Sequence, residues 1–233
     1  MLTGREREGE PGKSRAARAA ARRRAERRRL KKLLAYEEEY WAQGLVHIAG
    51  VDEVGCGPLA GPVVAAAVIL PPRIGIPGVA DSKSLLPDAR ERLAGEIRRQ
   101  AISIGLGAAS AREIDRLNIL RASHLAICRA VRRLRVAPQH VIVDGRPVPE
   151  LDVGYTAMPY GDALVHSVAC ASIVAKVMRD RLMRQLARRY PGYGWEHNAG
   201  YATADHLDAL RRLGPTPHHR LSFRQQLSFE LGD

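Results

Sequence analysis

The stretch Val63–Leu70 most constrains the fold of this chain, because all eight of its residues are apolar. Turn signals bound it on both sides, with Gly61-Pro62 before it and two prolines after it. A short apolar run of this kind predicts a β-strand that is buried on both faces. Hydrophobic residues make up 45% of the chain and aromatic residues only 5%, so Ala, Val, Leu and Ile must build the core. That composition favours a sheet covered by helices.

Shorter patterns predict the remaining elements. Strands are expected at 46–51, 102–107 and 141–145, and helices at 87–100, 117–134, 167–190 and 203–213, with Thr203 as an N-cap. Strands interleaved with helices indicate an α/β protein. The expected architecture is a mixed β-sheet flanked by helices, with a helical C-terminal part.

The formal net charge of +12 favours a polyanionic partner. Much of it lies in residues 1–34, which hold 13 Arg and Lys against 4 Glu. This segment is rich in Ala and Arg and poor in large apolar residues, so we expect it to be disordered or a solitary charged helix. A mitochondrial targeting peptide is the minor alternative, which the glutamates oppose. The predicted division is a basic tail at 1–34, a linker or short helix at 35–44, a folded domain at 45–223 and a tail at 224–233.

Several protein classes find no support in the sequence. The longest apolar stretch, Leu59–Leu70, is too short to span a bilayer, and no signal-peptide core follows the N-terminal charges. The three cysteines, Cys56, Cys128 and Cys170, are odd in number and far apart, which argues against a disulfide framework or a zinc site. The phosphate-binding loop of ATPases is absent. A cytoplasmic protein without membrane contact is expected.

Carboxylates follow two of the predicted apolar strands. Val51 leads into Asp52-Glu53, and Val143 leads into Asp144. Clustered carboxylates repel one another and raise each other's pKa unless a cation joins them. Their hard oxygen ligands suit Mg²⁺ or Mn²⁺, and a pair of such ions can hydrolyse a phosphodiester. Asp162 is the candidate for the fourth acid that a second metal needs.

A plainer interpretation exists for each of these acids. An acid after a strand is often a turn former or the N-cap of the next helix, as Asp144 could be. Adjacent residues of a strand also point to opposite faces, so Asp52 and Glu53 can share one site only where the strand ends or bulges.

The segment from Ala49 to Val63, with Asp52-Glu53-Val54-Gly55-Cys56-Gly57-Pro58 at its centre, resembles the signature of type 2 ribonucleases H, ribonuclease HII in particular. Other matches follow in family order over about Leu45–Phe223. They are Asp81-Ser82-Lys83, 114–120, 141–145, Ala171-Ser172-Ile173 through Lys176 to Arg179-Asp180, 190–194, Gly200-Tyr201 and 214–223.

The resemblance implies an RNase H-like fold, with 45–223 as the catalytic domain. It implies a metal site made by Asp52, Glu53, Asp144 and Asp162, holding two Mn²⁺ or Mg²⁺ ions. The implied activity is cleavage of the RNA strand of RNA–DNA hybrids and incision 5′ to ribonucleotides embedded in duplex DNA, leaving 3′-hydroxyl and 5′-phosphate ends. A monomer with a role in removing ribonucleotides from DNA is expected.

The same resemblance indicates substrate-binding residues. Gly55, Cys56 and Gly57 correspond to a Gly-Arg-Gly stretch that approaches the 2′-hydroxyl of the ribonucleotide, largely through backbone groups. A 2′-hydroxyl is what distinguishes RNA from DNA, and glycine allows a close approach. Tyr201 corresponds to the tyrosine that stacks on the neighbouring deoxyribose. Lys83 and Ser172 lie within matched motifs and are further candidates, although for Lys83 a solvated surface position is an equal alternative.

Three departures from the family pattern each remove a basic group. Cys56 stands where the family usually has Arg, Tyr160 replaces a Lys before Asp162, and Asn198-Ala199 replaces His-Lys before Gly200-Tyr201. We expect the chemistry to be intact, because none of these positions is one of the four acids. We also expect the basic tail to compensate partly for the lost phosphate contacts.

Other polar and aromatic residues are assigned structural roles. Ser172, Lys176 and Asp180 recur at four-residue steps, so they share one helix face and should tie that helix to its neighbour. Trp195 and Tyr193 are expected to be packing residues. The His218-His219-Arg220 run could suggest a metal cluster, but without a third suitable ligand we favour a surface or substrate-side role.

Two rival functions remain open. One is a non-catalytic nucleic-acid binder with the same fold and tail, whose binding would ignore Mg²⁺ and survive Asp52→Asn. The other is a related two-metal nuclease of different substrate preference, such as a ribonuclease HIII-like enzyme. Those enzymes usually carry a folded N-terminal domain, which residues 1–34 do not resemble.

Overall fold

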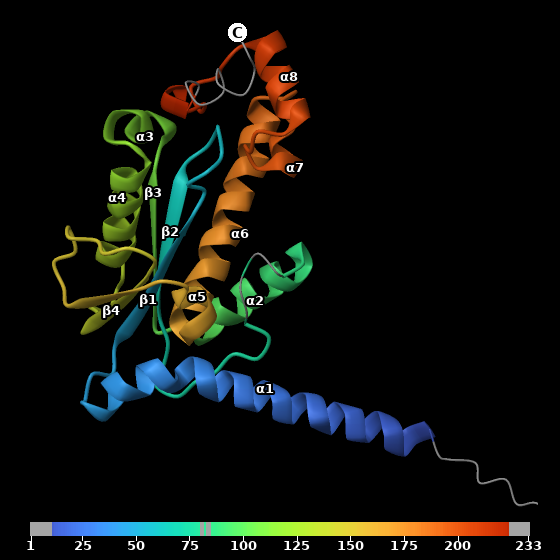
Figure 1. The fold of residues 1–233 in the computed structure, drawn as a ribbon, viewed down its shortest axis with the longest axis vertical. Coiled ribbons are helices and arrows are strands. Elements are labelled where there is room, and N and C mark those ends of the chain that lie inside the picture. The colour runs from blue at the N-terminus through green and yellow to red at the C-terminus, as the bar shows by residue number, and fades with distance from the viewer. Residues whose placement is uncertain (1–10, 80–81, 83–84, 224–233) are drawn as a thin grey trace, which may run out of the picture.

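Within the residues that the structure describes, five strands form one mixed sheet with helices on both faces (Figure 1). The structure is a computed structural model that describes residues 11–79, Ser82 and residues 85–223. The strands lie in the order β3-β2-β1-β4-β5. Their bounds are β1 (Ile48–Val54), β2 (Val63–Ile69), β3 (Ser103–Ala109), β4 (His140–Asp144) and β5 (Tyr155–Met158). The predicted α/β architecture with a mixed sheet is confirmed.

The helices follow the chain around this sheet. The long helices are α1 (Pro11–Ala42), α2 (Pro87–Gln100), α4 (Ile119–Arg132), α6 (His166–Arg189) and α8 (Ala204–Leu213). Shorter elements are α3 (Ala111–Leu117), α5 (Gly161–Leu164), α7 (Trp195–Asn198) and the 3₁₀ turn η1 (Leu221–Phe223).

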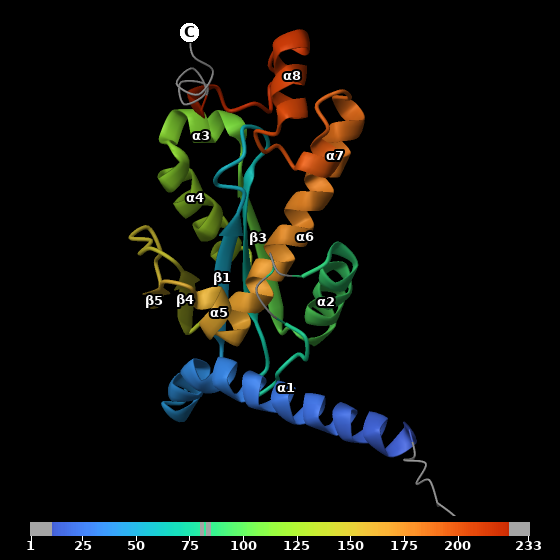
Figure 2. The ribbon, with the colours of Figure 1, turned by 45° about the vertical axis from the view of Figure 1, so that its right-hand side comes forward.

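Strand β2 is buried on both faces, as its sequence predicts. Its odd-numbered residues, from Val63 to Ile69, pack with α4 in one core cluster. Ala66 and Val68 pack with α2 and α6 in a second cluster on the opposite face. Figure 2 shows α4 and α6 on opposite sides of the sheet. The two faces explain why the run contains no polar residue.

Two glycines allow the covering helices to lie directly on the strands. A Cβ at Gly50 would lie 2.2 Å from the Ser167 carbonyl carbon at the start of α6. A Cβ at Gly107 would lie 2.0 Å from the carbonyl oxygen of Ala126 on α4. Because only glycine fits at these contacts, α6 is held close against β1, the strand that carries two of the candidate acids.

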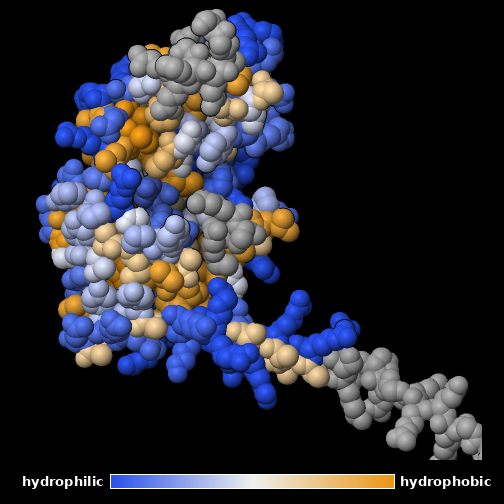
Figure 3. Space-filling view, in the orientation of Figure 1, coloured by the Kyte–Doolittle hydropathy of each residue, from blue (hydrophilic) through white to orange (hydrophobic). Residues whose placement is uncertain are grey.

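Helix α1 is continuous through the predicted boundary between residues 34 and 35. Of the two expectations for the basic segment, residues 11–34 take the helical one; residues 1–10 lie outside the described residues. The helix docks through its C-terminal half, because Leu33 and Leu34 are buried and Tyr40 stacks on His140 with ring centroids 4.4 Å apart. Residues 15–25 are exposed and project from the body (Figures 1 and 3). The division of the chain into domains stays a prediction.

Other differences from the predicted elements have local causes. The helix expected over 117–134 is broken at Asn118, whose φ of +70° ends α3 and whose side chain accepts a hydrogen bond from the Arg121 N–H to cap α4. The predicted N-cap Thr203 is confirmed, since its hydroxyl accepts from the His206 N–H. The short elements β5, α5 and α7 were not predicted, because four residues carry too little periodicity.

Cys56, Cys128 and Cys170 are all free thiols. Among the described residues, none of the helices combines the length and apolar character needed to cross a membrane.

Candidate active site

The four predicted acids line one cleft at an open edge of the sheet. Strands β1 and β4 are parallel, and their pairing runs as far as Val51 and Val143. Strand β4 then ends at Asp144, whereas β1 continues along β2 to Val54. The cleft beside the end of β4 has a volume of about 510 Å³. Its lining includes Asp52, Glu53, Asp144 and Asp162.

Asp52 and Glu53 lie inside β1, where they pair with Ala66 and Ala65 of β2. The expected strand end or bulge at these acids is therefore wrong. Their side chains take opposite sides of the sheet: Asp52 lies near Ser172 of α6, and Glu53 lies near Ser123 of α4. They still share one cleft, because β4 has ended and leaves this edge of β1 open.

Asp144 and Asp162 are joined through the short helix α5. The Gly161 N–H donates to Asp144 Oδ1 at 2.6 Å, and Asp162 follows in the same turn. Tyr160 precedes that turn in the left-handed conformation, with φ of +62°. The backbone contact therefore holds α5, with Asp162, against the end of β4.

The acids are electrostatically coupled, which raises the pKa of two of them. Burial raises the pKa of Asp52 well above its ordinary value, and the neighbouring charge of Glu53 raises it further. Asp144 and Asp162 add to this repulsion, while the Ser172 hydroxyl opposes it. Burial, followed by the charge of Asp144, also raises the pKa of Glu53. A cation in the cleft would relieve this repulsion.

The donor set fits hard divalent cations, because it consists of carboxylate oxygens. As the side chains stand, no group of three or more acids, histidines or cysteines among the described residues is arranged to hold a metal ion. Uncompensated carboxylates repel, so rotation of these side chains must accompany binding. The fit rests on the donor chemistry and on the electrostatic coupling of the four acids.

The predicted substrate-binding residues lie around the same cleft, with one outside the described residues. Gly55, Cys56, Gly57, Ser172 and Tyr201 all line it. Tyr201 is 47% exposed, and a Cβ at Gly57 would lie 3.8 Å from its ring. Lys83 lies outside the described residues. The loop after β1 and the tyrosine therefore face each other across the entrance.

Two of the three departures from the family pattern have visible consequences. Burial, and then the charge of Glu53, raise the pKa of the Cys56 thiol to about 12. The thiol is therefore neutral at physiological pH and adds no negative charge to the site. Asn198 accepts from the Gly200 N–H at 2.8 Å and donates to the Tyr193 carbonyl at 2.8 Å, so it shapes the turn before Tyr201.

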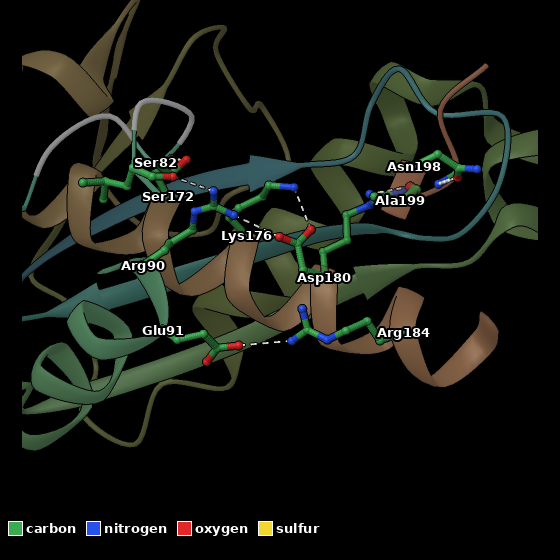
Figure 4. A network of polar contacts seen from close by, with 12 residues as sticks. Ser82, Arg90, Glu91, Ser172, Lys176, Asp180, Arg184, Asn198 and Ala199 are labelled. Atoms are coloured by element: carbon green, nitrogen blue, oxygen red, sulfur yellow. Dashed lines mark hydrogen bonds and ion pairs between the residues drawn. The ribbon is translucent and has the colours of Figure 1, made fainter. Parts of the chain in front are cut away.

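The polar row on α6 ties this helix to α2, as its spacing predicts. Lys176 Nζ lies 2.6 Å from Asp180, which also accepts from Arg90 of α2 at 3.0 Å (Figure 4). Ser172 bonds with Ser82 at 2.9 Å. Arg90 and Lys176 also line the cleft, and Arg90 is a residue that the sequence did not identify.

Two buried arginines lie behind the loop. Arg179 was not assigned any role from the sequence, and the surface position considered for Arg220 is wrong, because its side chain is buried. Arg220 donates to the carbonyls of Gly55, Cys56 and Gly61. Arg179 donates to the carbonyls of Ala60, Pro62 and Ala199. The only signal in the sequence was that both arginines lie within matched motifs.

Of the two histidines next to Arg220, His218 is partly exposed, whereas His219 is not a surface residue. His219 is buried, and its Nε2 lies 3.2 Å from His206 Nε2. His206 in turn accepts from the Trp195 indole N–H at 3.0 Å. The favoured surface or substrate-side role is therefore wrong for His219, because its ring fills the space between these aromatic groups. The predicted packing role of Trp195 and Tyr193 is confirmed by their burial.

Comparison with known proteins gives a consistent family assignment. The family model for ribonuclease HII matches residues 49–227. The ribonuclease HII of Desulfitobacterium hafniense strain Y51 is 49% identical over 201 residues, which cover 85% of this chain and 77% of that protein. The ribonuclease HII of Thermosynechococcus vestitus is 53% identical over 197 residues, which cover 83% of this chain and 91% of that protein.

A solved structure agrees with these relatives. The crystal structure of ribonuclease H2 from Pyrococcus horikoshii OT3 superposes with a TM-score of 0.64 at 27% identity, covering 79% of this chain and 97% of that one. The expected RNase H-like fold is confirmed by this likeness. On the family model, the relatives and the fold together, the chain belongs to the ribonuclease HII family.

Proposed function

We propose that this chain incises duplex DNA 5′ to an embedded ribonucleotide by two-metal-ion catalysis, leaving 3′-hydroxyl and 5′-phosphate ends. Its membership of the ribonuclease HII family makes it an endoribonuclease that cleaves RNA in RNA–DNA hybrids and at embedded ribonucleotides. The position of the cut, the metal ions and the residues that carry the reaction are the proposal. So is its setting, a cytoplasmic monomer that removes ribonucleotides from DNA.

One observation supports the proposed chemistry most strongly. Four carboxylates from three separate parts of the sequence line a single cleft, and burial together with the neighbouring acids raises the pKa of Asp52 and of Glu53. The burial of Asp52 and its repulsion from the other acids are unfavourable for the stability of the folded state, so folding alone does not explain an acid at this position. The cost is explained if cations bind there.

The residues that would hold two Mg²⁺ or Mn²⁺ ions are Asp52, Glu53, Asp144 and Asp162. When bound, such ions activate a water molecule for attack on the phosphate and stabilise the leaving oxygen. The chain supplies the positions of the ligands. The Glu53 N–H donates to the Asp52 carboxylate and the Gly161 N–H donates to that of Asp144, so each carboxylate is oriented by a backbone group.

Recognition of the ribonucleotide is assigned to the opposite wall of the cleft. Gly55, Cys56 and Gly57 present backbone without large side chains, which allows a sugar to approach closely. Tyr201 is exposed beside them and can stack on the adjacent deoxyribose. Lys176 adds a cation to the lining, and the exposed arginines of α1 add charge that can contact phosphates further along the duplex.

The test is incubation with a duplex that contains one ribonucleotide, in the presence of Mg²⁺ or Mn²⁺. The expected product is one nick 5′ to the ribonucleotide, with an all-DNA duplex of the same sequence left intact. Asp144→Asn should abolish cleavage while the duplex still binds. Cleavage by this variant at the wild-type rate would remove Asp144 from the mechanism, and a different cut position would overturn the proposed specificity.

A further inference from the structure

The loop Gly55–Pro62 rests on two guanidinium groups that make no ion pair with an acid among the described residues. Arg179 and Arg220 are 0% and 1% exposed. Within the described residues, every hydrogen bond that their side chains donate goes to a main-chain carbonyl, on the loop or at Ala199. Burial lowers the pKa of both groups, that of Arg220 to about 10, so holding them in place is unfavourable for the cations themselves. Burying a cation without a counter-ion is unfavourable, so these hydrogen bonds to carbonyls indicate that the conformation of the loop depends on them.

Arg220 contacts the two peptide groups that matter most for the wall of the cleft. Its Nη2 donates to the Gly55 carbonyl at 2.5 Å, and its Nη1 donates to the Cys56 carbonyl at 2.9 Å. In a planar trans peptide the N–H of the next residue points away from the carbonyl oxygen. The Cys56 and Gly57 N–H groups therefore point away from Arg220.

These two N–H groups face the cleft. Arg220 is buried and does not line the cleft, whereas Gly55, Cys56 and Gly57 do, so the arginine lies behind the loop. Neither the Cys56 N–H nor the Gly57 N–H donates a hydrogen bond to a partner in the described part of the chain. Two neighbouring backbone donors are thus left available for an oxygen atom of the substrate.

Further contacts fix the position of Arg220 and prevent the peptide groups of the loop from rotating. Its guanidinium lies 5.1 Å from the centroid of the Phe223 ring. Arg179 lies against Gly55 so closely that a Cβ at that glycine would be 2.1 Å from its Nε. The backbone of Arg220 itself pairs with Leu59 at 2.8 Å. Arg220 is therefore held both by the loop and by the C-terminal segment to which it belongs.

We infer that Arg220, supported by Arg179, is a positioning residue that turns the loop's peptide groups so that the Cys56 and Gly57 N–H groups read the ribonucleotide. This inference rests on the proposed function, because it supplies the reason why the loop can distinguish ribose from deoxyribose. It also explains how the loop keeps its form with Cys56 in place of the usual arginine: the orienting cation comes from behind, not from the loop itself.

The test uses Arg220→Lys, which retains the charge but loses the planar fork that bonds two carbonyls at once. Binding is measured in EDTA by fluorescence anisotropy, with a labelled duplex containing one ribonucleotide and an all-DNA duplex of the same sequence. The wild type should prefer the first duplex. The variant should lose about tenfold of this preference, which corresponds to about 1.4 kcal/mol, with unchanged affinity for the all-DNA duplex. In steady-state assays its KM should rise while kcat changes little.

Arg129→Lys is the matched control. Arg129 also donates to a main-chain carbonyl, that of Ala108 at 2.7 Å, but it lies on α4 away from the cleft lining. It should leave the preference unchanged. Arg179→Lys is the second variant if Arg220→Lys fails to fold, and a smaller loss of preference is expected because its carbonyls lie further along the loop.

The outcomes separate the inference from the proposed function. A folded Arg220→Lys protein that keeps the full preference, or that loses affinity for both duplexes equally, overturns the positioning role. If Arg220→Lys does not fold, an unchanged preference in Arg179→Lys overturns it as well. A wild type with no preference in binding or cleavage contradicts the proposed function itself, and the inference falls with it.

Discussion

Asp52→Asn should make the metal-free protein more stable while it abolishes cleavage. Asp52 is 6% exposed and shares its cleft with three other acids. Burial and the charge of Glu53 raise its pKa well above the ordinary value. At pH 7 the native state must therefore either hold this carboxylate ionised against repulsion or take up a proton, and both are unfavourable for folding. An amide avoids both costs.

The size of the effect follows from the pKa and from the Ser172 contact. Each unit by which folding raises the pKa corresponds to about 1.4 kcal/mol at a pH above that pKa. Losing the favourable interaction of the carboxylate with Ser172 takes back part of this gain. A net rise in the free energy of unfolding is expected, and each 1 kcal/mol of it corresponds to a rise in Tm of roughly 2–4 °C for a domain of this size.

The pH dependence has a definite sign. A group whose pKa is raised by folding binds more protons in the native state, so its destabilising effect is absent below the unfolded pKa of Asp and grows as the pH rises toward the folded pKa. The difference in Tm between Asp52→Asn and wild type should therefore be small near pH 4 and large near pH 7.

Thermal unfolding by calorimetry in EDTA is the assay, with Asp88→Asn as a control at an exposed position. Adding Mn²⁺ should raise the Tm of the wild type more than that of Asp52→Asn, because binding to the native state stabilises it. An Asp52→Asn protein that melts below the wild type in EDTA, with no dependence on pH, would refute the reasoning.

The remaining predictions concern the arm, the acid at the end of β4 and the exposed tyrosine. Removal of residues 1–24 spares the docked half of α1 and should raise KM with little change in kcat; a salt dependence equal to that of the full chain would show that the arm contacts no phosphates. Gly161→Ala places a Cβ 3.3 Å from Asp144 Oδ1 and should lower kcat several-fold without a large change in Tm, whereas Gly154→Ala, with its Cβ 3.6 Å from the nearest atom, should not affect kcat. Tyr201→Ala should raise KM about tenfold, as for the loss of one stacking contact, while Tyr36→Ala at another exposed tyrosine should not; equal KM values would exclude stacking by Tyr201.

Patterns in the sequence were sufficient where one physical constraint dominates. The run Val63–Leu70 is apolar at every position because both faces of β2 are covered, so its strand could be predicted without a partner in view. The acids at 52, 53 and 144 could be predicted as candidates because they adjoin such strands. Asp162 was predicted only as the fourth acid that a second metal needs, since its place next to Asp144 depends on the turn of α5, which no apolar strand indicates.

The parts that could not be predicted depend on contacts between distant segments. The strand β1 continues through Asp52-Glu53 because β2 pairs with it there, which no local pattern shows. The length and docking of α1 depend on Leu33, Leu34 and Tyr40 meeting the body, whereas its composition suggested only charge. The sequence does not distinguish a buried arginine such as Arg220 from an exposed one. Its role is recognised only when the structure shows the loop carbonyls around it.

The central claim is that the four acids together bind the catalytic cations. The most direct measurement is a crystal structure of the protein with Mn²⁺ and a duplex containing one ribonucleotide, in which anomalous scattering locates the metal. The account predicts Mn²⁺ peaks in the cleft, bound by carboxylate oxygens of Asp52, Glu53, Asp144 and Asp162 and adjacent to the phosphate on the 5′ side of the ribonucleotide. Metal bound elsewhere, in crystals whose protein cleaves this duplex in solution, would contradict it.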